Sequence, residues 1–225
     1  MKLILDHISF ERDNHLLFSN IHCVLQAGDI VQIRGANGCG KSTLLRIVAG
    51  FIEPSSGALW WQNKLISQQK DQYWQQLCFV GHQNGIKPYL TVRENLLLNS
   101  ALLHQPLPKH KLDSVLDRVG LLPLKKMQTQ QLSAGQARRL ALARLLISPA
   151  RLWILDEPTT ALDALGQALL VDLLNQHVAN GGMIIVATHH DLPLETTINT
   201  IQLDTKQLAP QKIARPNQLV GELHA

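Results

Sequence analysis

The 225-residue chain contains only three cysteines, few aromatic residues and no apolar run near the roughly 18 residues that a membrane-spanning helix needs. Cys23, Cys39 and Cys78 are widely separated, so they form neither a paired metal motif nor an even disulfide set, and we expect reduced thiols. The first residues also lack the apolar core of a secretion signal. These absences predict a protein that stays in the cytosol.

Charge is sparse and evenly spread along the chain. Charged residues make up 17% and hydrophobic residues 45%, as in typical globular domains, and the net charge is +4. Because the chain lacks a basic cluster, electrostatics predict no nucleic-acid partner. Haem binding is not indicated either, since there is no Cys-x-x-Cys-His motif and no histidine pair at an obvious ligand spacing.

A glycine-rich segment at 35–42 is the strongest positive signal. Its residues, Gly-Ala-Asn-Gly-Cys-Gly-Lys-Ser, satisfy the pattern G-x-x-x-x-G-K-[ST] at every fixed position. The segment follows an apolar run at 29–33, which we expect to be a buried strand, and opens a predicted helix at 42–49 that Gly50 caps. This context argues against a glycine-rich turn that fits by chance.

The loop predicts a nucleoside triphosphate site. Glycines let consecutive backbone N–H groups turn toward phosphate oxygens, and a helix N-terminus adds a favourable dipole. Lys41 can reach the β- and γ-phosphates, and the Ser42 hydroxyl can ligate Mg²⁺. Cys39 is also expected to be reactive, because a neighbouring lysine and a helix N-terminus both favour the thiolate. The nucleotide-binding residues expected here are Gly35, Asn37, Gly38, Cys39, Gly40, Lys41, Ser42 and Thr43.

Two adjacent carboxylates indicate the fate of the triphosphate. Asp156 and Glu157 stand at the end of an apolar segment typical of a strand, where the turning chain lets both approach one site. Asp156 is suited to hold Mg²⁺ through water, and Glu157 to polarise an attacking water as general base. Alone, the pattern also fits a solvated acidic turn. Combined with the loop, it favours a hydrolase over a kinase, since nothing indicates a second substrate.

The segment Leu132-Ser133-Ala134-Gly135-Gln136 makes the chain resemble the ATP-hydrolysing domains of ABC proteins, whose signature is LSGGQ; here alanine takes the third place. The other motifs of that family follow in order: Gln83 matches the Q-loop glutamine, 161–163 the D-loop, and His189 the switch histidine. The resemblance covers nearly the whole chain. It predicts an α/β fold, a P-loop NTPase domain of the ABC ATPase type with an antiparallel β layer and an inserted helical subdomain.

The resemblance also implies roles for these residues. Gln83 and His189 would join Glu157 in catalysis, and Gln83 would join Ser42 and Asp156 at Mg²⁺. The substrate would be ATP, because the Asn-Lys-x-Asp guanine box is missing. The residues expected to contact ATP held by a second copy of the chain, so that the nucleotide is sandwiched between two chains, are Ser133, Gly135, Gln136 and Asp163.

Residue patterns alone leave two of these roles open. Ser133 also fits an ordinary N-cap of a surface helix. His189 also fits a core or surface histidine, although it follows the apolar run 183–187, an expected parallel strand, and ligands gather at the carboxyl ends of such strands.

We predict one ABC ATPase domain over 1–225. The RecA-like core and the β layer would occupy roughly 1–83 and 150–204, and the helical subdomain roughly 84–149, where apolar residues recur at helical spacing. The tail, 205–225, carries no motif and is expected to be partly disordered. The loop 84–90 is expected to receive a helix of a membrane partner, although its residues also fit a plain surface loop.

Within the family, the segments 79–87 and 153–158 are similar to the ATPase subunits of haem exporters that serve cytochrome c maturation. This similarity implies integral membrane partner subunits, a peripheral position on the cytoplasmic face of the inner membrane, and no direct contact with haem. The alternatives are the ATPase of another transporter, for lipid, lipoprotein or drug, and a soluble ABC protein of translation or DNA repair. The last is disfavoured, because a long coiled coil does not fit into the roughly 115 residues between Lys41 and Asp156.

Arg12 occupies the place, 29 residues before Lys41, where ABC domains usually carry an aromatic residue against the adenine. Arg12 could stack its planar guanidinium on the base, which lysine cannot do. Alternatively, the contact with the face of the adenine is lost and ATP is held by its phosphates alone. In a third interpretation, Arg12 is a solvated turn charge paired with Asp13.

Overall fold

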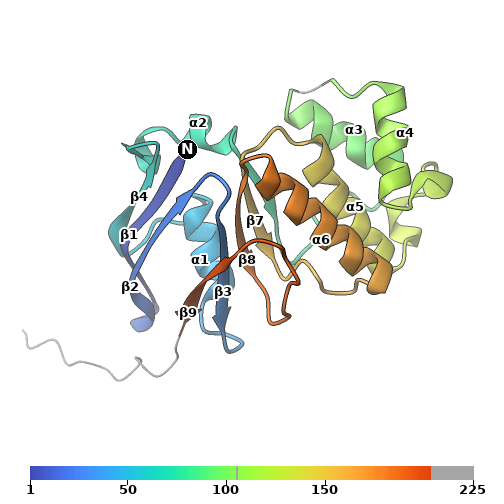
Figure 1. Ribbon diagram of the computed structural model, residues 1–225. Helices are drawn as coiled ribbons and strands as arrows, with labels where there is room; N and C mark the ends of the chain where they lie inside the picture. The colour runs from blue at the N-terminus through green and yellow to red at the C-terminus, as the bar shows by residue number, and fades with distance from the viewer. Residues whose placement is uncertain (105, 204–225) are drawn as a thin grey trace, which may run out of the picture.

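Two sheets organise the chain (Figure 1). The structure, a computed structural model, describes residues 1–104 and 106–203. The first sheet is antiparallel, with strand order β2-β1-β4-β5, and the second is parallel, with order β6-β7-β8-β3-β9. The predicted α/β fold with an antiparallel layer is therefore confirmed. The predicted disorder of the tail lies outside the described residues.

The strands are β1 (Lys2–Arg12), β2 (His15–Gln26), β3 (Ile30–Gly35), β4 (Ser56–Trp61), β5 (Lys64–Leu65), β6 (Leu77–Val80), β7 (Leu152–Asp156), β8 (Met183–Ala187) and β9 (Ile198–Leu203). The α-helices are α1 (Lys41–Val48), α2 (Lys70–Trp74), α3 (Val92–Leu102), α4 (Lys109–Arg118), α5 (Ala134–Ile147) and α6 (Ala164–Ala179). Short 3₁₀ turns lie at Ile66–Gln68, Leu122–Leu124 and Thr129–Gln131. Among the described residues, no helix is both long enough and apolar enough to cross a membrane.

Helix α1 lies between the two sheets and forms the main core. Its buried Leu44 and Ile47 share one apolar cluster with Leu5 of the antiparallel layer and with Ile154 and Ile185 of the parallel sheet. The opposite face of the parallel sheet is covered by α5 and α6. Burial on both faces explains why β8, and β7 up to its final Asp156, are continuous apolar runs rather than alternating ones.

A third cluster joins α3, α4 and α5 at the far end of the molecule (Figure 1). Its buried Val92 and Leu96 on α3, and Leu112 and Leu116 on α4, recur four residues apart, at helical spacing. Thr91 and Glu94 form a reciprocal capping box that starts α3. These helices occupy the region where the sequence predicts a helical subdomain; the exact boundaries of that unit stay a prediction.

Trp153 of β7 and His177 of α6 stack face to face, with ring centroids 3.7 Å apart and planes 9° from parallel. His177 Nε2 is also hydrogen-bonded to the carbonyl of Arg151, at 3.2 Å. Burial lowers the pKa of His177 to about 4, because the charged imidazolium loses its hydration. This stack fixes α6 against the strand that carries Asp156.

Acidification should therefore weaken the fold. In the unfolded chain His177 takes up a proton near pH 6.5, but the folded chain resists protonation down to about pH 4. Its stabilising contribution is thus complete above about pH 6.5 and declines as the pH falls toward 4. Urea unfolding between pH 7.5 and 4 should show a steeper loss in wild type than in His177→Phe. Equal pH dependence in the two proteins would contradict the assignment.

Candidate functional site

The predicted phosphate-loop residues, Asp156 and Glu157 meet at the carboxyl ends of β3, β7 and β8. The parallel register pairs Asp156 with Ala187, and Ala187 with Ile33, so the segments that follow the three strands share one edge of the sheet. A cavity of about 450 Å³ opens there. It is lined by Arg12, Leu17, Asn37, Gly38, Gly40, Lys41, Ser42, Thr43, His82, Asp156 and Glu157.

The phosphate loop presents a helix N-terminus with nothing capping it. Gly40, the N-cap of α1, has φ 101°, makes no side-chain cap hydrogen bond, and is followed by no acidic residue in the first turn. The first N–H groups of a helix have no intrahelical partner, so those of α1 are available to an anion. Gly38 has φ 82° and open space where a Cβ would stand. The loop therefore fits a phosphate chain.

Lys41 is held at the centre of the site. Its side chain is nearly buried, and Nζ donates to the carbonyls of Gly35 at 2.9 Å and Ala36 at 3.2 Å. Nζ also lies 2.9 Å from Nε2 of His189. An ammonium group only donates, so His189 Nε2 accepts in this contact. A γ-phosphate entering the cavity would compete with these three neutral acceptors for the lysine charge.

His189 is placed to exchange partners. Its Nε2 lies 2.8 Å from Asn37 Oδ1 and 3.5 Å from Glu157 Oε1, besides the contact with Lys41. One nitrogen cannot accept from Lys41 and donate to an oxygen at the same time, so these contacts are alternatives that depend on where the proton sits. The histidine thus connects the phosphate loop to the carboxylate at the end of β7.

A buried side-chain amide, that of Gln32, positions this histidine. The sequence did not indicate this role. Gln32 on β3 is fully buried, and its Nε2 donates to the carbonyls of Thr188 at 3.4 Å and His190 at 3.3 Å. The two carbonyls flank His189, so the amide holds the turn that presents the imidazole. A glutamine inside an apolar strand segment is the signal that could have predicted this role, because buried amides need partners.

Asp156 and Ser42 fit a divalent cation. Asp156 is 4% exposed and lines the cavity, and within residues 1–104 and 106–203 its carboxylate accepts no hydrogen bond. A nearly buried carboxylate without partners is costly unless a cation or water occupies its oxygens. Ser42 lines the same cavity. The donor set is all oxygen, as Mg²⁺ prefers.

Arg138 joins the site to α5. This side chain is 2% exposed, and the sequence motifs did not predict its role. Its guanidinium donates to the carbonyls of Asp156 at 2.9 Å and Glu157 at 2.7 Å. Further bonds reach the carbonyls of Pro158 and Gly81 and the side-chain oxygen of Asn84. Burial lowers the pKa of Arg138, an effect that the nearby Asp156 and Glu157 oppose. One side chain thus ties α5 to the turn after β7 and the loop after β6.

The signature segment lies at the start of α5 and does not line the cavity. Ser133 caps the helix, its Oγ accepting from the N–H of Gln136 at 3.2 Å, while Gln136 Oε1 accepts from the Ser133 N–H. The hydroxyl keeps its proton as a donor, so capping does not prevent anion binding. A Cβ at Gly135 would lie 2.8 Å from the carbonyl of Ala161, which explains glycine there. The substituted Ala134 is exposed and costs no contact.

Asp163 and Gln83 have different surroundings. Asp163 caps α6, its Oδ1 accepting from the N–H of Gly166 at 2.8 Å. Gln83 is exposed and does not line the cavity; its neighbour His82 does. The chain bends at these two residues. Catalytic and metal roles for Gln83 stay a prediction for the nucleotide-bound state.

The expectation of a reactive Cys39 is wrong in one respect. Its side chain is 3% exposed and belongs to the main core, where a Cβ on Gly35 would lie 2.6 Å from Sγ. The sulfur therefore points away from solvent, under the loop, and an alkylating reagent has no direct access. Cys39 can contact phosphate only through its backbone.

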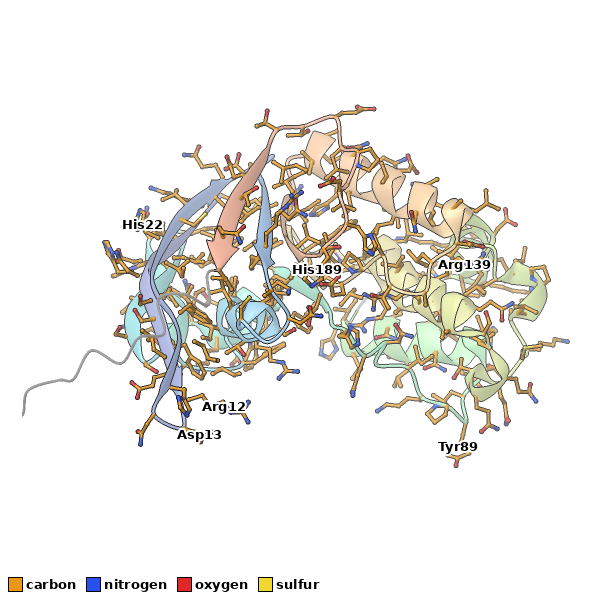
Figure 2. The ribbon with its side chains drawn as sticks, turned by 90° about the horizontal axis from the view of Figure 1, so that it is seen from below. Arg12, Asp13, His22, Tyr89, Arg139 and His189 are labelled. Atoms are coloured by element: carbon orange, nitrogen blue, oxygen red, sulfur yellow. The ribbon has the colours of Figure 1, made fainter. Side chains whose placement is uncertain are left out.

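Arg12 lies at the cavity and at the hairpin end of β1 (Figure 2). Its Nε is also 3.6 Å from Asp13 Oδ2, with both side chains largely exposed. Leu17 lines the same wall. The position is compatible with stacking on a base and with a solvated ion pair, so the choice between those two predictions stays open.

Comparison with known proteins identifies this arrangement. Residues 18–160 match the family model of the ABC transporter, so the chain belongs to this family, as one of its ATP-binding subunits. It is 42% identical over 192 residues, 85% of this chain and 91% of the other, to the cytochrome c biogenesis ATP-binding export protein CcmA of Haemophilus influenzae. The resemblance to the ATPase subunits of cytochrome c maturation is therefore confirmed.

Solved structures agree on the fold. An ABC transporter ATP-binding protein from Pyrococcus furiosus superposes with a TM-score of 0.79 at 22% identity, covering 93% of this chain and all of that one. A dimeric ATP-binding cassette in a post-hydrolysis state, bound to ADP and Pi, gives 0.73 at 24% identity, covering 84% of this chain and 88% of that one. At these identities the likeness establishes the fold alone.

Replacing Arg138 by lysine should damage both stability and turnover. Lysine cannot reach the same carbonyls with one ammonium group, so buried acceptors lose their donors at a cost of about 2–4 kcal/mol in unfolding free energy. Arg139→Lys is the matched control, because that half-buried neighbour makes one bond, to the Val119 carbonyl. Urea unfolding and ATPase rates measure the two effects. Wild-type stability in Arg138→Lys would refute the role.

Proposed function

We propose that this chain hydrolyses MgATP to energise an export complex that serves cytochrome c biogenesis, with haem as the cargo that the complex handles. The observation that carries the hydrolysis is that Lys41 and Glu157 line one cavity, and that His189 contacts both of them. The name of the relatives, a cytochrome c biogenesis ATP-binding export protein, supports the transport role.

The chemistry is the displacement of ADP from the γ-phosphorus by water. Glu157 takes a proton from the attacking water. The oxygen of that water bonds to the γ-phosphorus, and the bond between this phosphorus and the ADP oxygen breaks. Lys41 neutralises the charge that develops on the phosphate oxygens. His189 holds the γ-phosphate through Nε2, the atom now shared among Lys41, Asn37 and Glu157. Ser42, Asp156 and Gln83 would hold Mg²⁺, which would supply further charge neutralisation.

Two copies of the chain complete the site. The α5 N-terminus of the signature segment does not line the cavity of its own chain, so it is available to a nucleotide on a second copy. Ser133 and Gly135 would donate to the γ-phosphate there, with Gln136 and Asp163 bordering the interface. The dimeric ATP-binding cassette that is bound to ADP and Pi has the same fold, and it supports this arrangement.

The loop after β6 is the proposed dock for integral membrane subunits. Buried Asn95 holds it rigidly, with Nδ2 donating to the carbonyls of Lys87 and Leu90 and Oδ1 accepting from the Lys87 N–H at 2.7 Å. The turn presents Tyr89, which is 76% exposed and projects from the molecule (Figure 2). Because Arg138 and Arg144 bond the start of this loop, nucleotide-driven movement would reach the partner. We place the chain, so docked, on the cytoplasmic face of the inner membrane, without contact to haem.

Glu157→Gln should separate binding from hydrolysis. Without a general base, turnover should fall by at least about 100-fold, while ATP binding persists. The variant should accumulate as a dimer in ATP, measured by gel filtration with light scattering. Exposed Glu195→Gln is the control and should hydrolyse ATP normally. Near-wild-type turnover in Glu157→Gln would exclude this residue as the base.

Tyr89→Ala should uncouple the chain from its membrane partner. Gly85 is a poorer test position, because its φ of +64° strains any other residue. With Tyr89 truncated, integral membrane proteins should no longer co-purify from detergent extracts, while the ATPase rate of the isolated chain stays unchanged. Leu102→Ala, 71% exposed on α3, is the control. Unchanged co-purification would place the dock elsewhere.

A further inference from the structure

A second polar cluster lies on the outer face of the antiparallel layer, away from the nucleotide cavity (Figure 2). It consists of Asp6 and His7 on β1 and His22 on β2. Their ligand-type atoms all lie within 4.8 Å of one another. The spacing of 15 residues between the histidines did not indicate a pair, but strand pairing brings the rings to 5.2 Å.

A β-bulge builds the cluster. Leu5 pairs with Cys23 and Ile8 with Ile21, so Asp6 and His7 together stand opposite His22. His7 takes φ 51°, the left-handed region, and so departs from the alternation that would have sent it to the other face. Gly57 of β4 accommodates the bulge, because a Cβ there would lie 2.4 Å from the carbonyl of His7. Both strand and glycine are therefore adapted to this local geometry.

The potential ligand atoms of the three side chains lie close to one another. Asp6 Oδ1 lies 3.8 Å from His7 Nε2 and 3.7 Å from His22 Nδ1. Ligands about 2.0–2.1 Å from a tetrahedral zinc are separated from each other by about 3.3 Å. The two separations from Asp6 are close to that value, and the three side chains are 44–65% exposed, so small rotations would complete the geometry.

Asn20 orients the first of these ligands. His7 Nδ1 is hydrogen-bonded to Asn20 Oδ1, and since a carbonyl oxygen only accepts, the ring carries its proton on Nδ1. Nε2, which faces Asp6, is left with its lone pair. A histidine that ligates a metal characteristically donates its other N–H to an oxygen in this way. Asn20 itself sits in a left-handed bulge, φ 55°, where its N–H donates to Ser9 Oγ.

We propose that Asp6, His7 and His22 form a surface site for a divalent transition cation of the zinc type, with an open fourth position. Two imidazoles and one carboxylate suit Zn²⁺, Ni²⁺ and Cu²⁺. Mg²⁺, which prefers oxygen ligands, does not compete for it. A cavity of about 520 Å³ beside the cluster, lined also by Lys2, Trp60 and Asn63, gives room for water or a further ligand. The site is independent of the nucleotide chemistry.

Calorimetric titration of the nucleotide-free chain with Zn²⁺ alone tests the proposal. Wild type should bind one equivalent, and His22→Ala and His7→Asn should each weaken binding by at least about 10-fold; asparagine tolerates the left-handed backbone at 7. Asn20→Gly should keep the stoichiometry and lose about 10–100-fold in affinity. Exposed His15→Ala, on the same strand as His22, is the control and should bind as wild type.

Three further measurements distinguish loss of the site from loss of the fold. Urea unfolding without metal should show every variant folded, and Zn²⁺ should raise the thermal midpoint of wild type but not of His22→Ala. Absorption of the Co²⁺-loaded chain distinguishes nitrogen and oxygen ligands from thiolates. No saturable equivalent in wild type would leave the cluster as a solvated surface group and overturn the proposal. An equivalent that survives both histidine substitutions, or a thiolate spectrum, would overturn it as well.

Discussion

The site depends on one constraint, the parallel register of β7, β8 and β3. Apolar side chains on both faces of these strands hold them between α1 on one side and α5 and α6 on the other, which aligns their carboxyl ends. The groups proposed for the chemistry come at the carboxyl ends of these strands. They are the phosphate loop after β3, the carboxylates at the end of β7 and His189 after β8. A shift of one strand by one residue would separate Lys41 from His189, so the chemistry rests on packing that contains no catalytic group.

Buried polar side chains transmit this order to the surroundings. Arg138 joins α5 to the turn after β7 through carbonyls, and Gln32 holds the turn that presents His189. The acceptors of the buried Arg138 guanidinium are backbone carbonyls, which hold the side chain in one orientation. A carboxylate side chain as partner could rearrange. Since α5 also carries the signature segment, a change in the turn after β7 would be transmitted to the surface that we propose to face a second copy.

Much of the fold and the core of the site could be predicted from the sequence. The glycine spacing at 35–42 predicts a phosphate loop by itself, whereas the apolar runs before Asp156 and His189 predict strands and leave the roles of these residues to the other motifs. Three features escaped prediction because they depend on long-range pairing. The bulge that joins His7 to His22 arises from strand register, the burial of Cys39 from packing against β9, and the Arg138 contacts from the crossing of α5 over two loops. Gln83 shows the reverse limit, since a motif predicts a role but not the conformation of the loop that carries it.

The central claim is that the cavity around Lys41 hydrolyses ATP. Phosphate release by the purified chain at saturating ATP and Mg²⁺ tests it most directly, in wild type and in Lys41→Ala, with exposed Lys64→Ala as control. Wild type and control should release phosphate at the same rate, saturating in ATP, and Lys41→Ala should be slower by at least about 100-fold. Equal rates in wild type and Lys41→Ala, or no saturable release by wild type, would contradict the account.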